Sequence, residues 1–308
     1  MQQRSEDRDL EPLEGDPIDW NGVAEATFVL RQRFRYEYPG PIADLHHRLV
    51  VVPRERHGDQ RRIASRLDVT PPVSAHDEVD EFGNPVTTFF ARKVETSIEF
   101  AHLSVVTRTA QPEHRIAGTA LDDPALRRAT ALTACDAELR ATARRLRAQN
   151  DDPHQLAGAI NALVFREMRY QAGSTNVETT AASAYAQRSG VCQDYAHVMI
   201  ALARHAGLAA RYVSGHMVGE GGTHAWVEVF APAGISAQIL AFDPTHGRRV
   251  DMRYIVIAVG RDYADVAPTS GVFTAPYNGE LTAIKRVGAT RLRYAPPSSG
   301  LLSDAAAS

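Results

Sequence analysis

With 308 residues, the chain is long enough to form one large hydrophobic core or two smaller ones. Hydrophobic residues make up 44% and charged residues 23% of the chain, which is the composition of an ordinary globular protein. The formal net charge of −3 gives no electrostatic reason to expect a nucleic-acid binder, so we predict no nucleic-acid partner.

Residues 1–20 are polar and acidic and have no sustained apolar period, so we expect a disordered N-terminal tail there. This stretch is the opposite of a secretory signal, and no apolar run approaches the roughly 18 residues that cross a bilayer. The chain has only two cysteines, which excludes a disulfide scaffold and suits a reducing compartment. We therefore predict a cytoplasmic protein that does not bind membranes.

Residues 21–120 have the pattern of β-strands. Apolar and aromatic side chains fall mostly on alternate positions from Phe28 to Tyr38, and Pro39-Gly40-Pro41 ends that run. A turn at residues 80–85 is followed by two more β-rich stretches, at 86–90 and 96–106. We interpret this region as a small antiparallel β-rich domain without visible chemistry of its own.

Helical signals begin near residue 121. Asp123-Pro124 and Asp152-Pro153 each place a capping residue before a proline suited to the first helical turn. The predicted helix after Asp123 carries an apolar stripe, made of Leu132, Cys135, Leu139 and Leu146. Cys135 on that stripe is interpreted as a small core residue. The basic cluster Arg144, Arg145 and Arg147 is interpreted as a solvated helix face.

Further helices and then strands follow in order. A short helix is predicted from Thr180 to about Arg188, and a longer one from about Cys192 to His205 that Gly207 ends. Three strand-like runs come next, at residues 210–218, 225–230 and 238–242. Residues 121–290 are therefore predicted to form an α+β domain of helices plus an antiparallel sheet. The Ser- and Ala-rich residues at 291–308 are predicted to be a flexible tail.

Cys192 differs from Cys135 in its position. It follows Ser189-Gly190-Val191, so a glycine turn delivers it to the first turn of a predicted helix. Free backbone N–H groups and the positive end of the helix dipole favour a thiolate there, and the thiolate is the nucleophilic form of cysteine. On position alone, packing of the helix start is an equally good interpretation.

A thiolate needs a base, and the base needs an orienting group. Among the 12 histidines, His224 stands at the start of a strongly β run and directly after a glycine-rich loop, where it can face a cleft. Asp243 ends the next predicted strand. If the two strands are antiparallel neighbours, Asp243 comes level with His224 and can fix its tautomer. Each residue alone has a plain structural interpretation, as a loop histidine or a turn aspartate, but the order Cys192, His224, Asp243 favours a catalytic triad.

These residues lie in motifs that resemble the transglutaminase-like superfamily. The motifs are Ser189-Gly190-Val191-Cys192-Gln193-Asp194, Thr223-His224-Ala225-Trp226 and Phe242-Asp243-Pro244-Thr245. Residues 175–180 and 259–268 are similar to the lead-in and closing motifs of that family, and the N-terminal region is similar to the β domain of its bacterial members. The resemblance covers residues 24–275. It implies a papain-like fold with Cys192, His224 and Asp243 as the triad.

The sequence departs from the family pattern at two positions. Members often have tyrosine where this chain has His216, and asparagine where it has His246. The tryptophan-glycine run usual before the aspartate is also absent. Because these positions border the expected cleft, substrate preference is not carried over from relatives.

The predicted chemistry is acyl transfer from an amide through a Cys192 thioester, with a peptide or protein amide as substrate. His224 protonates the leaving amine, Asp243 orients His224, and the Cys192 backbone N–H is one oxyanion donor. Gln187 is a candidate for the second donor, although an exposed helix residue is the plainer interpretation. Hydrolysis, as in a peptidase or amidase, is the favoured outcome. Transfer to an amine, as in a transglutaminase, is the alternative.

Other classes of function remain open at this point. One is an acyltransferase with a thioester donor, and another is a peptide-binding module that is catalytically silent. A zinc site built from Cys192, His216, His224 and Asp243 is disfavoured because the short ligand pairs usual in zinc sites are absent. We expect no cofactor and no metal, including calcium, since no Asp-rich calcium loop is visible. The sequence gives no oligomeric state.

Three further groups have structural interpretations. His197 lies on the nucleophile helix and is expected to point away from the thiol, and His205 is expected at the C-terminal end of that helix. Arg261, Asp262 and Tyr263 are interpreted as a structural group that holds the C-terminal part of the domain.

Overall fold

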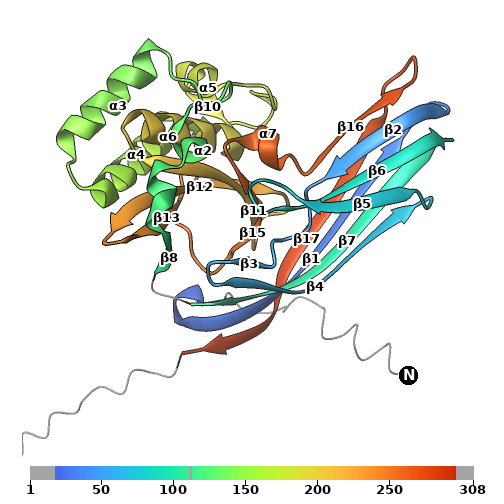
Figure 1. The fold of residues 1–308 in the computed structure, drawn as a ribbon, viewed down its shortest axis with the longest axis horizontal. Coiled ribbons are helices and arrows are strands. Elements are labelled where there is room, and N and C mark those ends of the chain that lie inside the picture. The colour runs from blue at the N-terminus through green and yellow to red at the C-terminus, as the bar shows by residue number, and fades with distance from the viewer. Residues whose placement is uncertain (1–17, 111–112, 296–308) are drawn as a thin grey trace, which may run out of the picture.

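The computed structural model describes residues 18–110 and 113–295 (Figure 1). Most of the predicted N-terminal tail at 1–20 and of the C-terminal tail at 291–308 lies outside these residues. Residues 20–22 form a short 3₁₀ helix and residues 291–294 belong to a strand, so the parts of both predicted tails that are described are ordered.

The elements follow one another in an order that begins with strands. The N-terminal strands are β1 (Val23–Glu37), β2 (Ile42–Leu49), β3 (Arg56–His57), β4 (Gln60–Thr70), β5 (Ser74–Val79), β6 (Pro85–Val94), β7 (Ser97–Thr109) and β8 (His114–Ala117). The helices are α2 (Pro124–Arg127), α3 (Ala137–Gln149), α4 (Pro153–Glu167), α5 (Ala181–Gln187), α6 (Cys192–His205) and α7 (Tyr263–Val266). The later strands are β9 (Arg169–Tyr170), β10 (Ser189–Gly190), β11 (Ala209–Met217), β12 (His224–Ala233), β13 (Ser236–Asp243), β14 (Arg248–Arg249), β15 (Tyr254–Gly260), β16 (Thr269–Thr274) and β17 (Glu280–Tyr294).

The N-terminal strands form two facing sheets. One has the order β17-β1-β7-β4-β3 and the other the order β16-β2-β6-β5. Residues at alternate positions of β1, β2, β6 and β7 are buried together between the sheets, with Phe34, Leu45, Phe89 and Phe100 among them. The alternation of apolar and polar residues in these strands therefore packs as a β-sandwich.

The second body is a twisted sheet covered by helices on one face. Its order is β14-β13-β12-β11-β15, with β8 added beside β13. Helix α6 packs against β12 and against α3, α4 and α5, and every residue from Gln193 to Arg204 is buried. No helix of the described residues combines the length and apolarity needed to cross a membrane. The predicted α+β class, with helices packed on an antiparallel sheet, is confirmed.

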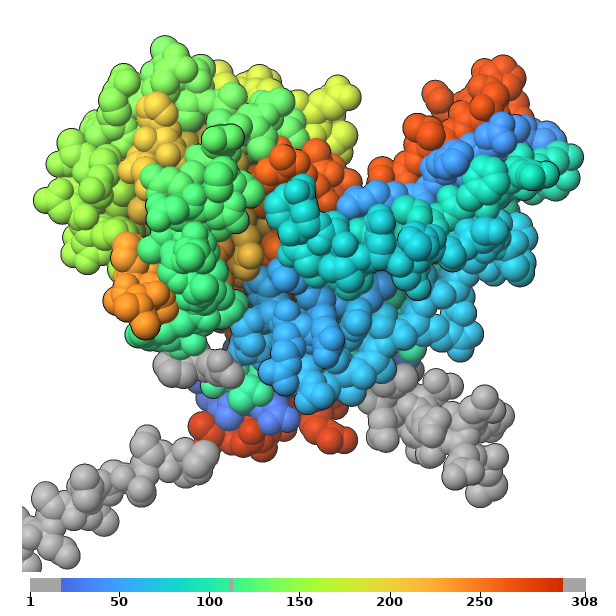
Figure 2. Space-filling view, in the orientation of Figure 1, coloured from blue at the N-terminus to red at the C-terminus, as the bar shows by residue number. Residues whose placement is uncertain are grey.

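The sandwich covers the other face of this sheet. Along β12, Val227 and Val229 belong to the core under the helices, whereas Trp226 lies in a separate cluster that Phe82 of the sandwich joins. Figure 2 shows that the two bodies meet along their lower part and that the surface is hollowed between the helical body and the projecting ends of β2, β6 and β16.

The predicted boundary between the two domains needs correction. Residues 121–290 were assigned to the core, but β16 pairs with β2 and β17 pairs with β1 over its whole length. The chain therefore returns to the sandwich after the core, and residues 269–294 belong to the N-terminal sheets. Pairing between segments at opposite ends of the chain is set by tertiary packing and leaves no local signal.

The single helix predicted after Asp123 is also wrong. Helix α2 has only four residues, and α3 starts anew at Ala137 with Asp136 as its N-cap. Between them, the Thr130 and Thr133 side chains exchange hydrogen bonds with each other's backbone N–H groups, which competes with helical pairing. Cys135 lies in this connection, and its Sγ donates to the carbonyl of Ala201 at 3.3 Å, so its interpretation as a packing residue is retained without the helix.

Two side-chain amides fasten the sandwich to the core. Within the described residues, the edge strand β15 has no strand partner on its outer side, and Gln60 and Asn84 pair with its backbone groups instead. The Gln60 amide donates to the C=O of Val256 at 2.7 Å and accepts from its N–H at 2.8 Å. The Asn84 amide donates to the C=O of Val259 at 2.8 Å and accepts from its N–H at 2.9 Å. Each amide thus replaces a neighbouring strand at one residue.

Asn84→Ala is expected to lower the free energy of unfolding by about 2–6 kcal/mol. The change leaves two buried backbone groups of Val259 without partners, and each such group costs about 1–3 kcal/mol. Asn84 is fully buried, so water cannot replace the amide without rearrangement. Denaturant unfolding measures the effect, with the exposed Asn278→Ala as the control, expected to stay within about 0.5 kcal/mol. Equal effects of the two changes would contradict the docking role.

Candidate active site

Cys192 is the first residue of the buried helix α6. The side chain of Asp194, two residues on, holds the start of this helix by accepting from the Val191 N–H at 2.8 Å and the Thr175 hydroxyl at 2.6 Å. Gly190 is needed for this approach, because a Cβ there would lie 2.6 Å from the Cβ of Asp194. The half-buried Cys192 is therefore held in the first turn, where backbone N–H groups are free.

His224 and Asp243 lie side by side on neighbouring strands. His224 is the first residue of β12 and Asp243 is the last of β13, and these strands are antiparallel, as predicted. His224 Nε2–H donates to Asp243 Oδ2 at 2.8 Å. The imidazole is 3% exposed and the carboxylate is fully buried, so water does not compete for this bond.

Asp243 accepts five hydrogen bonds. Its Oδ2 atom receives His224 Nε2–H, His246 Nδ1–H at 2.7 Å and the Tyr254 hydroxyl at 2.7 Å. Its Oδ1 atom receives the backbone N–H groups of Thr245 and His246 at 2.9 and 3.2 Å. Burial alone would raise the pKa of this carboxyl, but the bonds from His224, Tyr254 and His246 outweigh burial and hold the pKa well below its usual range. Asp243 is therefore a fixed anion.

The His224 imidazole is held in its cationic form. Burial lowers its pKa, but the bond to Asp243 and the interaction with the Cys192 side chain outweigh burial and raise the pKa to about 10. Both ring nitrogens then carry hydrogen at neutral pH. Because Nε2–H is directed at Asp243, the Nδ1–H is the proton available on the side of Cys192.

Tyr254→Phe is expected to lower the free energy of unfolding by about 1.5–3 kcal/mol, because it removes a hydrogen bond to a buried charge. The phenyl ring can keep the edge contact with Trp226, whose centroid lies 5.4 Å away. Asp243 keeps four donors, so we expect the reactivity of Cys192 to change less than tenfold, or about 1.4 kcal/mol. Denaturant unfolding and thiol alkylation measure the two effects. Loss of reactivity without loss of stability would show that Tyr254 acts on the triad directly.

Glu220 is a member of the site that the sequence did not indicate. It stands in the glycine-rich loop between β11 and β12, and its carboxylate lies 3.3 Å from His224 Nδ1 and 3.1 Å from His246 Nε2. It therefore approaches the same imidazole nitrogen that Cys192 needs. The only signal in the sequence is a lone acidic residue between glycines at 219 and 221.

His216 and His246, the two departures from the family pattern, lie in different surroundings. His246 donates to Asp243 and contacts Glu220, so it is part of the hydrogen-bond network around His224 and Asp243. His216 is 2% exposed on β11, and its Nδ1 lies 3.0 Å from the Gly222 carbonyl. Burial lowers the pKa of His216 to about 4, so it is neutral. The zinc set weighed from sequence is not assembled, since Cys192 and His216 belong to neither metal-type cluster found among the described residues.

The remaining side chains named in the sequence analysis are either exposed or make contacts within the fold. Gln187 is exposed at the end of α5, as is His205 at the end of α6, and Arg144, Arg145 and Arg147 are exposed on α3. His197 is fully buried and accepts the Tyr263 N–H on Nε2 at 3.1 Å. Arg261 pairs with Asp265, and Asp262 caps α7. The motif at 261–263 therefore connects α6 to β15 and α7.

Comparisons with known proteins agree with this architecture. A model of the transglutaminase-like superfamily core matches residues 140–237, and a model of the bacterial transglutaminase-like N-terminal region matches residues 28–107. An uncharacterized protein of Mycobacterium leprae is 29% identical over 276 residues, which is 83% of this chain and 96% of the relative. An uncharacterized protein of Mycobacterium bovis is 30% identical over 273 residues, which is 80% of this chain and 87% of the relative.

One solved structure has the same fold along most of its length. It is the crystal structure of a "putative cysteine protease" from Cytophaga hutchinsonii, with a TM-score of 0.68 and 22% sequence identity. The alignment covers 88% of this chain and 93% of that chain, so it includes both the sandwich and the core.

Proposed function

The chain belongs to the transglutaminase-like superfamily, and we propose that it is a cysteine-nucleophile acyl-transfer enzyme that hydrolyses amide bonds. The observation that carries the proposal is that Asp243, which accepts five hydrogen bonds, holds the His224 imidazole beside Cys192. Burial of a carboxylate is costly, and the donors and the imidazole around Asp243 offset that cost.

In the proposed first step, the Cys192 thiolate attacks the amide carbonyl carbon and a C–S bond forms. The oxygen of the tetrahedral intermediate is stabilised by the Cys192 backbone N–H, which is free in the first turn of α6. When the C–N bond breaks, His224 Nδ1–H gives its proton to the leaving amine. The products of this step are a thioester on Cys192 and a neutral imidazole.

In the second step, water attacks the thioester. His224 Nδ1 takes a proton from the water, the C–S bond breaks and a carboxylic acid leaves. An amine in place of water would make the protein a transglutaminase through the same intermediate. Hydrolysis is favoured because Glu220 and His246 place polar, half-exposed groups beside His224, which suits entry of water.

The proposed substrate is a peptide or protein amide, and the proposed site of action is the cytoplasm. A reducing compartment keeps the Cys192 thiol free, and neither Cys135 nor Cys192 has a disulfide partner in the structure. Cell fractionation tests the location, and recovery of the native protein outside the cytoplasm contradicts it.

The experiment uses the full chain with a library of peptide amides, and intact mass spectrometry detects the acyl-enzyme. The expected result is an adduct on Cys192 that water discharges, with release of the free acid. Added primary amine separates the two outcomes: if the amide of that amine is the main product, the transferase assignment replaces hydrolysis. If no library member forms an adduct although the thiol is reactive to iodoacetamide, a substrate class outside peptides is required. An unreactive thiol would favour a silent peptide-binding module.

A further inference from the structure

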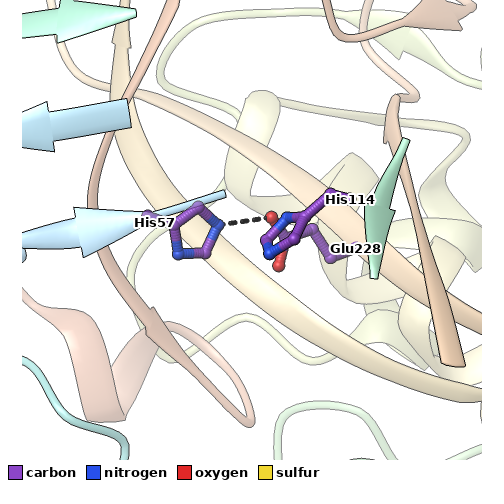
Figure 3. A group of neighbouring side chains, drawn as sticks. All are labelled: His57, His114 and Glu228. Carbon is purple, nitrogen blue, oxygen red and sulfur yellow. Dashed lines mark hydrogen bonds and ion pairs between the residues drawn. The ribbon is translucent and has the colours of Figure 1, made fainter. Parts of the chain in front are cut away.

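A second cluster of polar side chains lies at the boundary between sandwich and core, away from the nucleophile. It consists of His57 on β3, His114 on β8 and Glu228 on β12. His57 is 7% and Glu228 3% exposed, while His114 is half-buried. Three segments that are far apart in the sequence thus bring two imidazoles and a carboxylate to one point (Figure 3).

The potential ligand atoms of the three residues face one another. One ring nitrogen of each histidine and one oxygen of Glu228 all lie within 4.8 Å of one another. His57 Nε2 is 2.6 Å from Glu228 Oε1, and the two imidazole rings are nearly perpendicular, with centroids 5.6 Å apart. In Figure 3, the His57 nitrogen points at the Glu228 carboxylate beside the His114 ring. The His114 ring also packs closely on Gly58, where a Cβ would lie 2.6 Å from Nδ1.

Glu228 is fixed in orientation and in charge. Its second oxygen, Oε2, accepts from Arg211 Nε at 2.7 Å and lies 2.6 Å from Arg211 Nη2, which leaves Oε1 directed at the histidines. The Arg211 guanidinium is the cation that pairs with this buried carboxylate. A carboxylate that is ionised and held by an outer partner is preorganised as a metal ligand.

We propose that His57, His114 and Glu228 form a zinc-binding site that fastens the sandwich to the core. Two imidazoles and one carboxylate are a donor set that Zn²⁺ takes in proteins, with bonds of about 2.0–2.2 Å. Ligand atoms on a tetrahedral ion then lie about 3.3 Å apart. His57 and Glu228 would therefore move apart by less than about 1 Å, and the ion would replace the hydrogen bond between them.

The space beside the cluster can accept the ion and a fourth ligand. A cavity of about 200 Å³ is lined by the three residues together with Asp59, Trp226 and Tyr254. The carboxylate of Asp59 is engaged by Arg108 at 2.8 Å, so it is not a free ligand. Water from the cavity supplies the fourth position, since the site has room for it and the lining is polar.

The position of the zinc site on β12 determines which part of the protein the ion would stabilise. Glu228 is two residues along β12 from Trp226, whose ring stacks on His224 with centroids 6.3 Å apart. Joining β3 and β8 to β12 at this point fixes the strand that carries the triad histidine. The ion thus stabilises the junction of the two bodies and takes no part in acyl transfer.

The test uses the full chain, stripped of metal with a chelator and then titrated with Zn²⁺. We expect one bound Zn²⁺ per chain by mass spectrometry of metal content and calorimetry, and a rise in Tm. Co²⁺ bound tetrahedrally at the same site gives a visible absorption spectrum, which reports the coordination geometry independently of affinity and Tm. His114→Ala is expected to weaken Zn²⁺ binding more than about 100-fold, because even outer partners of ligands contribute 10–100-fold.

Two variants serve as controls. His154→Ala removes an exposed histidine on α4 and is expected to bind Zn²⁺ like the parent. His246→Ala changes the second cluster, made of His224, Asp243 and His246, which could take up metal instead. Because the His114 side chain makes no hydrogen bond within the described residues, its alanine variant is expected to fold, which circular dichroism checks. Absence of Zn²⁺ binding in the micromolar range overturns the proposal, as does binding that survives His114→Ala and is lost in His246→Ala.

Discussion

Cys192→Ala is expected to abolish amide hydrolysis, with a loss of at least about 10³-fold in kcat/KM. The alanine cannot form a thioester, and no other nucleophile among the described residues stands beside His224 at the start of α6. The fold is expected to persist, since Cys192 is half-buried and only one atom is removed. The measurement is turnover of the best peptide amide, with intact mass spectrometry for the missing acyl-enzyme.

Cys135→Ala is the matched control for this change. Both cysteines are half-buried and unpaired, but Cys135 donates only to a backbone carbonyl of α6. We expect Cys135→Ala to keep full activity. If Cys192→Ala retained activity within tenfold, the nucleophile would lie elsewhere and the triad assignment would be wrong.

Asp243→Asn is expected to lower kcat/KM by about 10³–10⁴-fold, the cost of losing the orienting carboxylate in a serine triad. The neutral amide cannot stabilise the His224 cation. Its NH₂ group would also face donors, because the Asp243 oxygens accept from His224, His246, Tyr254 and two backbone N–H groups. The imidazole therefore loses both its charge and its fixed orientation.

The pH dependence of Asp243→Asn shows in which direction the pKa of His224 moves when the carboxylate is lost. The pKa of His224 is raised to about 10, so the imidazolium is present below that pH and is lost as pH rises through it. In Asp243→Asn the pKa of His224 falls, so the alkaline decline of kcat/KM is expected at lower pH than in the parent. Asp251→Asn is the control, because Asp251 is half-exposed and pairs with Arg253 away from the triad. An alkaline limb at the same pH in Asp243→Asn and in the parent would contradict the role of Asp243.

The elements that carry Cys192, His224 and Asp243 are predictable from the sequence because their signals are local. Asp152 and Thr180 cap α4 and α5, and Cys192, His224 and Asp243 each stand at the end of an element with strong periodicity. The close approach of two strands in the sheet requires glycine at one position, since a Cβ on Gly215 would lie 2.1 Å from the carbonyl oxygen of Ile255. Residues that determine one helix or strand, or its contact with the next element, can be predicted from the sequence.

Features that depend on distant segments were not predictable. Nothing near β17 indicates that it pairs with β1, and nothing near Gln60 or Asn84 indicates that each amide pairs with β15. The approach of Glu220 to His224, and the meeting of His57 and His114 with Glu228, likewise require the complete fold. The residues in these contacts are of types that are common in strands and loops, so the local sequence does not indicate the contacts. The contacts form only when the complete chain folds.

The alkylation rate of Cys192 as a function of pH tests the central claim most directly. Iodoacetamide reacts with thiolates, and peptide mass spectrometry reads Cys192 and Cys135 in the same sample, so that Cys135 is an internal control. We expect rapid alkylation of Cys192 below neutral pH in the parent and loss of that reactivity in His224→Ala, with Cys135 slow throughout. Equal reactivity of Cys192 in the parent and in His224→Ala, or a Cys192 as inert as Cys135, would contradict a thiolate–imidazolium pair.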